Sequence, residues 1–398
     1  MADNDMEKGL KYSITRRDFL KGTVALGGAT LMGGLSLASG KRDAWAEQKD
    51  PLKLGFITSY SGPYGTIANE QLKGLKLALD EVNAKGGVLG RQVEVLDRDD
   101  KLNPGEAIKK FKELVEKEKI DIMMGTLSAA TLVAINEQTK KLNMLFMTVA
   151  QSQEITAEPD FGPYTFHEAF TPNMMAHAVG NWVLDNLGKK VYFMVANYAW
   201  GNQNYAAFSQ VMKEKGGTNL GVVKHPLGTS DYSAFFPTIL AANPEVLVIV
   251  NGGSDTVNSM KQLVSFGLRD KMKVCYALGE TLTGKEAGQS NVAGIYFGTH
   301  FYWESQDTIP SAKRFVSAFQ AKWGYPPTGY AGYAYSGALE LLNAIERAKT
   351  LEPDKVAKQL EGREYDNYKG KQWWRACDHQ SFQDWYIMKG RDATKGEW

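Results

Sequence analysis

The chain has 398 residues, of which 43% are apolar and 23% are charged, and its net charge at pH 7 is +1. These values are typical of a folded globular protein and exclude disordered and collagen-like chains. Because basic and acidic residues balance, no overall field favours nucleic acid or an anionic membrane as a partner. Charged residues and glycines interrupt the apolar runs, which excludes a protein with several membrane-spanning helices.

Residues 1–46 have the pattern of an export signal. Thr15-Arg16-Arg17-Asp18-Phe19-Leu20-Lys21 resembles the twin-arginine export motif, and a glycine-rich, weakly apolar stretch follows from Gly22 to Gly40. Ala44-Trp45-Ala46 then has the small-x-small pattern of a cleavage site. The alternative is an N-terminal membrane anchor, which the glycines disfavour. We therefore expect export to the periplasm by the twin-arginine route, without a lipid anchor, because no cysteine stands near the cleavage site.

The chain has two cysteines, Cys275 and Cys377. An oxidising periplasm permits a disulfide between them, whereas the strand-like surroundings of Cys275 are typical of a buried free thiol. Both states stay open, because spacing in the sequence does not give distance in space. No Cys-x-x-Cys motif and no pair of histidines at the spacing of metal ligands is present, so we expect neither a metal nor another cofactor.

The first part of the mature chain alternates strands and amphipathic helices. A strand is expected at residues 52–58, and the helix that follows from residue 66 ends at Gly86-Gly87. The next expected elements are a strand at 93–96, a helix that begins at Pro104, a strand at 120–124, a helix at 129–141 and a strand at 144–148. A loop that contains Pro159 and Pro163 comes next.

The alternation continues to the end of the chain. The expected elements are helix 174–187, strand 191–195, helix 202–215, strand 221–224, helix 232–241, strand 246–250, helix 256–266, strands 273–277 and 295–298, helices 312–323, 330–349 and 354–361, and short strands within 370–388. This alternation predicts parallel sheets whose two faces are both covered by helices. The strand–helix units number more than a single open sheet usually contains. The final run of helices argues against an eight-unit barrel, so we predict an α/β fold of two doubly wound lobes.

Motifs for catalysis are not found in the sequence. It has no Gly-x-Ser-x-Gly elbow and no lysine-containing phosphate loop, and the glycines at 86–90 follow a helix, where a dinucleotide fingerprint would precede one. The five histidines are expected to be core or surface residues. We therefore expect no enzyme activity. A secreted hydrolase is the weakest alternative, because catalytic triads assemble from distant residues.

Small hydroxyls and aromatic residues follow several predicted strands. Ligands of doubly wound sheets bind beyond the carboxyl ends of the strands, and N–H groups and hydroxyls at a helix start suit a carboxylate. Ser128 opens such a helix, although plain N-capping explains it equally well. Trp200 either covers a planar ligand or packs between the lobes. Glu280 either pairs with an ammonium group or is a free loop carboxylate.

The sequence resembles the periplasmic solute-binding proteins of the leucine/isoleucine/valine type, which supply ABC transporters. The resemblance covers nearly all of residues 52–398. The segments that carry it are Ser61–Gly65, residues 74–90, Asp99-Asp100 before Asn103-Pro104, Gly125 with Ser128, Tyr198–Gly201, Phe315–Pro327, the helix at 330–349 and Asp378-His379-Gln380.

The resemblance implies a type I periplasmic binding protein, with two Rossmann-like lobes joined by three crossings. Lobe one would comprise residues 52–168 plus 302–368, and lobe two residues 169–301 plus 369–398. The lobes would close on a small organic ligand and present it to the membrane permease subunits of an ABC transporter. We also expect a monomer. A periplasmic sensor with the same fold, which signals to a regulator, is the second reading.

The resemblance also implies a set of ligand-binding residues. In amino acid binders of this type, groups after the third and fourth strands hold the carboxylate, an acidic residue of lobe two holds the amino group, and aromatic residues cover the ligand. The matching positions here are Tyr64, Ser128, Ala129, Ala150, Ser152, Trp200, Asn251 and Glu280.

Several positions depart from the pattern of the amino acid binders. Ala129 stands where a hydroxyl is usual, Asn251-Gly252 where an aromatic residue is common, and Ser336 where an aspartate is frequent. His167 stands where many relatives carry arginine. The ligand therefore stays open among an amino acid, an aromatic carboxylate and an amide such as urea.

Overall fold

Strands and helices alternate along residues 50–392, the part of the chain that the computed structural model describes. The predicted export signal lies outside these residues. The strands are β1 (Leu52–Thr58), β2 (Val93–Asp99), β3 (Ile122–Gly125), β4 (Phe146–Thr148), β5 (Thr165–His167), β6 (Lys190–Ala196), β7 (Thr218–His225), β8 (Val246–Val250), β9 (Lys273–Tyr276), β10 (Tyr296–Thr299), β11 (Glu364–Tyr365), β12 (Gln372–Trp374), β13 (Ser381–Phe382) and β14 (Tyr386–Lys389).

Helices connect most of these strands. They are α1 (Gly65–Ala84), α2 (Pro104–Glu113), α3 (Ala129–Lys141), α4 (Pro172–Met175), α5 (Asn181–Asn186), α6 (Ala199–Glu214), α7 (Phe236–Ala241), α8 (Ser254–Ser265), α9 (Leu268–Lys271), α10 (Thr281–Ala287), α11 (Gln289–Val292), α12 (Pro310–Trp323), α13 (Gly329–Ala348) and α14 (Pro353–Leu360). The π-helical turns η1 (Leu114–Glu118) and η3 (Ala176–Gly180) extend α2 and α4, and η2 (Glu154–Thr156) and η4 (Trp303–Asp307) are 3₁₀ turns.

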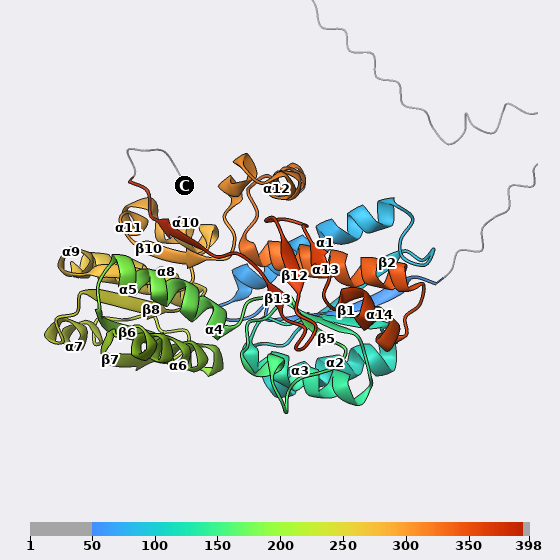
Figure 1. The fold of residues 1–398 in the computed structure, drawn as a ribbon, viewed down its shortest axis with the longest axis horizontal. Coiled ribbons are helices and arrows are strands. Elements are labelled where there is room, and N and C mark those ends of the chain that lie inside the picture. The colour runs from blue at the N-terminus through green and yellow to red at the C-terminus, as the bar shows by residue number, and fades with distance from the viewer. Residues whose placement is uncertain (1–49, 393–398) are drawn as a thin grey trace, which may run out of the picture. The chain divides into compact units, whose positions relative to one another are not determined.

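Two sheets form the centre of the fold, and they lie side by side in Figure 1. The first has the parallel order β2-β1-β3-β4-β5. The second has the order β14-β10-β9-β8-β6-β7, in which β14 runs antiparallel to β10 and the other pairs are parallel. Because neighbouring strands are joined through helices, this topology confirms the predicted pair of doubly wound sheets.

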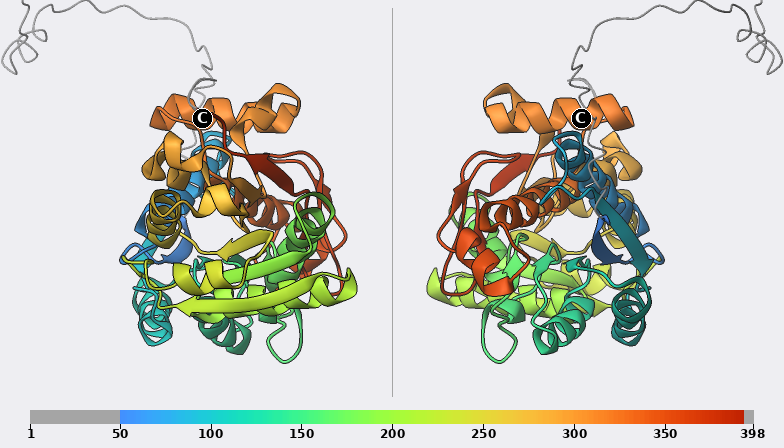
Figure 2. Two further views of the ribbon diagram at one scale, coloured as in Figure 1. Left: turned by 90° about the vertical axis from the view of Figure 1, so that its left-hand side faces the viewer. Right: turned by 90° about the vertical axis from the view of Figure 1, so that its right-hand side faces the viewer.

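Each sheet is buried on both faces by helices (Figure 2). In β1, Phe56 belongs to the core that includes α1 and α13, whereas Ile57 belongs to the core that includes α2 and α3. In β6, Phe193 packs with residues of α6, and Met194 with residues of α7 and α8. Because both faces of the sheets are buried, these strands consist of nearly continuous apolar residues.

The chain crosses between the two sheets three times. It leaves β5 for α4, returns from β10 to α12 and α13, and finally passes from β13 to β14. The small antiparallel sheet β11-β12-β13 contacts β5 through a bridge between His167 and Gln380, and the rings of Phe166 and Trp374 meet edge to face at 5.5 Å. The predicted division at residue 369 falls between β11 and β12 of this small sheet, whereas the contacts join the whole small sheet to the five-stranded sheet.

A few local features differ from the sequence predictions or decide between them. The expected loop around Pro159 and Pro163 also contains β5, and the short helices α9, α10 and α11 were not predicted. Cys275 is buried in β9, Cys377 is exposed, and the two thiols are not bonded to each other. None of the helices in residues 50–392 is long and apolar enough to cross a membrane.

Candidate functional site

A small cavity lies where loops from both sheets meet. The loops follow the carboxyl ends of β1, β3 and β4 in the first sheet and of β6, β8 and β9 in the second. The lining residues are Tyr64, Ile67, Leu127, Ser128, Ala129, Gln151, Tyr198, Trp200, Gly252, Leu278 and Tyr330. The carboxyl ends of parallel strands are the usual ligand sites of such sheets, so this is the candidate ligand cavity.

The loop after β1 holds Tyr64 at the cavity. Asp99 accepts hydrogen bonds from the backbone N–H of Tyr60 at 3.0 Å and from the Ser61 hydroxyl at 2.5 Å, and Asp100 accepts one from the Ser59 hydroxyl at 2.6 Å. Both carboxylates stand at the end of β2, next to this loop. Asp99 and Asp100 therefore fix the loop that carries Tyr64.

Ser128 and Ala129 lie at the start of α3, as the sequence predicts. Ser128 is the N-cap residue, it is only 5% exposed, and its side chain makes no capping hydrogen bond. The first N–H groups of a helix have no partner within the helix and favour negative charge. The start of α3 thus offers the cavity a hydroxyl and free N–H groups.

Aromatic rings cover the opposite side of the cavity. Tyr198 and Trp200 stand at the start of α6, with ring centroids 6.0 Å apart, and the ring of Tyr64 lies 6.1 Å from that of Tyr198. The hydroxyls of Tyr64 and Tyr198 are hydrogen-bonded to each other. Burial raises the pKa of both phenols, so they are neutral at physiological pH. Trp200 Nε1 is buried and, among the described residues, has no hydrogen-bond partner.

A second direct contact joins the loops of the two sheets beside this tyrosine pair. The backbone N–H of Ser254 donates a hydrogen bond of 3.1 Å to Pro63 O. Gly253, with φ of +55°, makes this approach possible, because a Cβ atom there would lie 2.2 Å from Pro63 O. At Gly252, a Cβ would lie 3.1 Å from the Tyr64 ring. A side chain at position 252 would therefore press against the Tyr64 ring.

Three of the predicted site residues lie behind the cavity wall. Ala150 O contacts His167 Nε2 at 2.6 Å, the hydroxyl of Ser152 accepts from the backbone of residue 154 at 3.3 Å, and Asn251 Oδ1 contacts His225 Nε2 at 2.8 Å. None of the three is among the lining residues. Burial lowers the pKa of His167 to about 4, so it is a neutral, structural hydrogen-bonding residue.

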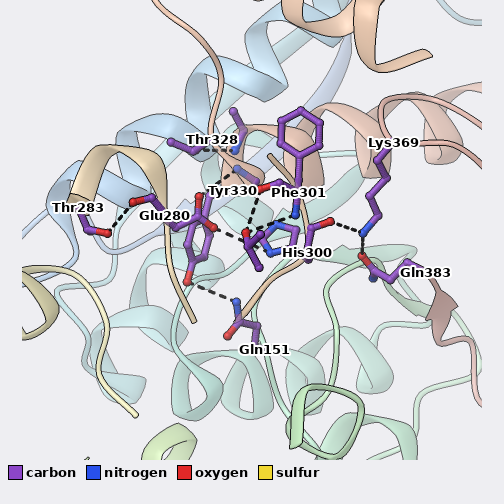
Figure 3. A network of polar contacts seen from close by, with 12 residues as sticks. Gln151, Glu280, Thr283, His300, Phe301, Thr328, Tyr330, Lys369 and Gln383 are labelled. Atoms are coloured by element: carbon purple, nitrogen blue, oxygen red, sulfur yellow. Dashed lines mark hydrogen bonds and ion pairs between the residues drawn. The ribbon is translucent and has the colours of Figure 1, made fainter. Parts of the chain in front are cut away.

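Glu280 is the fourth predicted site residue that does not line the cavity. It lies at the N-cap of α10 (Figure 3). Its Oε2 accepts a hydrogen bond of 3.1 Å from the backbone N–H of Gly329, at the start of α13. Its Oε1 is 3.9 Å from Nδ1 of His300 and has no hydrogen-bond partner within residues 50–392. Burial raises the pKa of Glu280 to about 8 and lowers that of His300, so both are neutral at pH 7.

Polar contacts tie the crossing segments together behind this pair. Lys369 donates to His300 O at 3.0 Å and also bonds Gln383, as Figure 3 shows, and Gln383 donates to Glu168 O at 2.9 Å. Burial lowers the pKa of Lys369 to about 7 and raises that of Glu168 to about 7. These four residues come from all three crossings, so one buried network links the segments about which two lobes would rotate.

Sequence reasoning did not assign Ile67, Leu127, Gln151, Leu278 or Tyr330 to the site. Most of them directly follow strands whose ends had been identified, so the signal was available. Which side chain of each loop points inward could not be read, because loops lack a fixed side-chain period. Among the described residues, no group of three His, Cys, Asp or Glu side chains is arranged to hold a metal ion.

The periplasmic binding protein family matches residues 51–396. The chain belongs to this family. The match spans both sheets and every loop of the cavity, and it agrees with the type I periplasmic binding protein fold expected from the resemblance. The signal sequence of the twin-arginine translocation pathway matches residues 13–33. This periplasmic binding protein is therefore exported to the periplasm by that route.

Known proteins similar to this family member agree with the assignment. A Leu/Ile/Val-binding protein homolog 7 from Brucella suis is 25% identical over 85% of this chain and 86% of its own. The amino acid ABC transporter substrate-binding protein from Pseudomonas fluorescens is 26% identical, with a TM-score of 0.81 over 88% of this chain and 93% of its own. A solute-binding protein from Rhodopseudomonas palustris in complex with 3,4-dihydroxybenzoic acid shares the fold, at 22% identity and a TM-score of 0.78 over 86% and 93%.

Proposed function

We propose that this periplasmic binding protein captures a small organic solute for an ABC importer and presents it to the membrane permease subunits. The observation that carries the proposal is the cavity at which the strand ends of both sheets meet. Relatives whose names refer to Leu/Ile/Val binding and to an amino acid ABC transporter support the same role. On this proposal the chain is not an enzyme, acts as a monomer and has no nucleic acid partner.

The proposed ligand contacts follow from the lining of the cavity. Ser128 and the N–H groups at Ala129 receive the carboxylate of the solute, since they form a helix start with an unused hydroxyl. Tyr64 and Trp200 cover its apolar body from the two sheets. The other four predicted residues lie outside the lining, so on this proposal they support the lining residues and do not contact the solute; they are Ala150, Ser152, Asn251 and Glu280.

Closure of two lobes over the solute is the proposed mechanism. Lobe one would comprise residues 52–168 and 302–368 together with the small sheet up to residue 382, and lobe two residues 169–301 and the remaining tail. The Tyr64–Tyr198 and Pro63–Ser254 contacts join the lobes and would break on opening. A solute that contacts both lobes binds the closed state better and so shifts the population toward it.

A thermal-shift screen of the mature protein tests this function. The panel contains aliphatic amino acids, aromatic carboxylates, amides, urea and dicarboxylates. A solute at one hundred times its Kd adds about 2.7 kcal/mol to the free energy of unfolding, which raises Tm by several degrees. A panel without any shift, together with a denatured extract that contains no stoichiometric small molecule, would contradict the proposal.

A further inference from the structure

We infer that the cavity selects an aromatic carboxylate without an α-ammonium group over an amino acid. The inference rests on the proposed function, because it names the solute class of the same site. Four observations carry it: the absence of charge in the lining, the position of the nearest carboxylates, the aromatic walls and the donors at the cavity.

The lining of the cavity is uncharged. Among the described residues that line it, the polar side chains besides the tyrosines and Trp200 are Ser128 and Gln151, and neither is ionisable. An α-amino acid brings a buried ammonium group, which needs an opposite charge or several acceptors to offset the loss of its hydration. A carboxylate alone needs only donors, and the start of α3 supplies them.

Two carboxylates near the cavity lie outside its lining, and in each one oxygen accepts from a backbone N–H while the other has no hydrogen-bond partner within residues 50–392. Oε2 of Glu280 accepts from the backbone of Gly329, and Leu278 rather than Glu280 lines the cavity on that side. Asp255 accepts a 3.1 Å hydrogen bond from the backbone of Gly228, and it too is outside the lining. Because burial keeps Glu280 protonated at pH 7, it does not offer a negative charge to an ammonium group.

The walls of the cavity fit a planar ring. Tyr64, Tyr198 and Trp200 form a continuous row with centroid separations of 6.1 Å and 6.0 Å, and Tyr330 adds a fourth ring from the start of α13. Aromatic side chains pair favourably with a further ring at such separations.

One buried donor at the cavity, Trp200 Nε1, has no hydrogen-bond partner in the described part of the chain. The Ser128 hydroxyl, which lines the same cavity, makes no capping bond at the helix it precedes. Buried polar groups are rarely left without a partner. Both groups are donors, and a ligand that brings acceptors, as a carboxylate does, would bond them.

Titration calorimetry with matched solutes tests the inference on the mature protein. The probes are 3-phenylpropanoate and L-phenylalanine, which differ by the α-ammonium group, and 4-methylpentanoate and L-leucine, which differ in the same way without the ring. We expect 3-phenylpropanoate to bind at least tenfold tighter than both L-phenylalanine and 4-methylpentanoate. L-phenylalanine or L-leucine binding within tenfold of its deaminated partner, or more tightly, would overturn the inference but leave the proposed function intact.

The absence of binding by all four probes would also overturn the inference. The proposed function would then fall only if the broader thermal-shift panel and the denatured extract were negative as well. The two failures are therefore distinguishable.

The isosteric variant Gln151→Glu provides a second test of the charge argument. It places a carboxylate in the lining at unchanged size, so we expect the preference for 3-phenylpropanoate over L-phenylalanine to fall at least tenfold. Gln210→Glu, on the exposed side of α6, adds the same charge away from the cavity and should leave the preference unchanged. A preference that Gln151→Glu leaves unchanged, in a variant with the circular dichroism spectrum of the wild type, would overturn the inference.

Discussion

Trp200 and Tyr64 reach the cavity from opposite sheets, so a ligand in the cavity would contact both side chains only with the two sheets this close together. Trp200 is 4% exposed and stands one residue inside the start of α6, where the sequence placed an aromatic cover. Its large ring lies next to that of Tyr198. Removal of this ring would take away both a wall of the cavity and a donor.

We expect Trp200→Ala to weaken binding of 3-phenylpropanoate at least tenfold, because the planar wall and the Nε1 donor are lost. The variant should also be less stable by about 3 kcal/mol, the usual cost of truncating a buried aromatic residue. Trp373→Ala is the matched control, since Trp373 is 42% exposed on β12 and lies outside the cavity. Calorimetry that finds equal affinity for the wild type and Trp200→Ala would remove Trp200 from the site.

Glu280 predicts a pH dependence of stability. Its ordinary pKa of 4.5 is raised to about 8 in the folded chain. As the pH rises from about 4.5 towards 8, the unfolded chain loses this proton first, so the folded state loses stability across that window. Glu280→Gln removes this contribution. We expect Tm of the variant minus Tm of the wild type to be several degrees larger at pH 8 than at pH 5.

Thermal melts of both proteins at the two pH values measure this difference. The shift in pKa corresponds to an energy on the order of 4 kcal/mol, at 1.36 kcal/mol for each pKa unit. A difference in Tm that is the same at pH 5 and pH 8 would contradict the assignment of a raised pKa to Glu280.

For single residues, the sequence predicted which positions lie at the cavity better than it predicted what each side chain contacts. Four of the eight expected site residues, Tyr64, Ser128, Ala129 and Trp200, line the cavity, because a strand end and a helix start can be read from residue patterns. Glu280 was expected either to pair with an ammonium group or to be a free loop carboxylate, and in the structure it is buried, with Oε2 bonded to the start of α13. The direction of a loop side chain depends on contacts across more than forty residues of sequence, which no local pattern contains.

At the scale of elements, the loops after β1 and β8 bring the two sheets into contact. The contact between Pro63 and Ser254 depends on Gly253, whose φ of +55° and lack of a Cβ atom leave room for the opposite loop. The contact between the two sheets is therefore specified in part by single backbone positions.

Gly253→Ala should hinder closure, because the added Cβ would lie 2.2 Å from Pro63 O. We expect affinity for 3-phenylpropanoate to fall at least tenfold. Gly216→Ala is the control, since Gly216 also has a positive φ, of +70°, but meets no atom within 4 Å. It should cost about 1 kcal/mol of stability and leave affinity unchanged. Equal affinities of the two variants in calorimetry would contradict a role for Gly253 in closure.

Most elements were predictable because their cores impose a clear period. Strands such as β8 are apolar throughout, and α1 repeats apolar residues at helical spacing up to the glycines that end it. The three-residue strand β5 was missed among prolines, since its place in the sheet comes from pairing with β4 rather than from its own pattern. The short helices α9 to α11 are too brief to show any period.

At the scale of the whole molecule, three crossings connect the two sheets, and one buried network of Glu168, His300, Lys369 and Gln383 links them. The number of crossings followed from the family resemblance, because composition and periodicity do not reveal which sheet a strand joins. The residue at which the third crossing occurs was not predicted correctly from the resemblance. The small sheet β11-β12-β13 attaches to β5 through contacts between residues that are distant in the sequence. A linked set of crossings suits a hinge that moves two rigid sheets as units.

The radius of gyration of the mature protein, with and without solute, tests the central claim that the lobes close over a ligand. The protein is unfolded, freed of any bound solute and refolded, and X-ray scattering is recorded before and after saturation with 3-phenylpropanoate or, if that solute does not bind, with the one that raises Tm most. We predict a smaller radius of gyration on saturation, because the ligand stabilises the Tyr64–Tyr198 and Pro63–Ser254 contacts. Saturable binding with an unchanged radius of gyration would contradict closure as the mechanism.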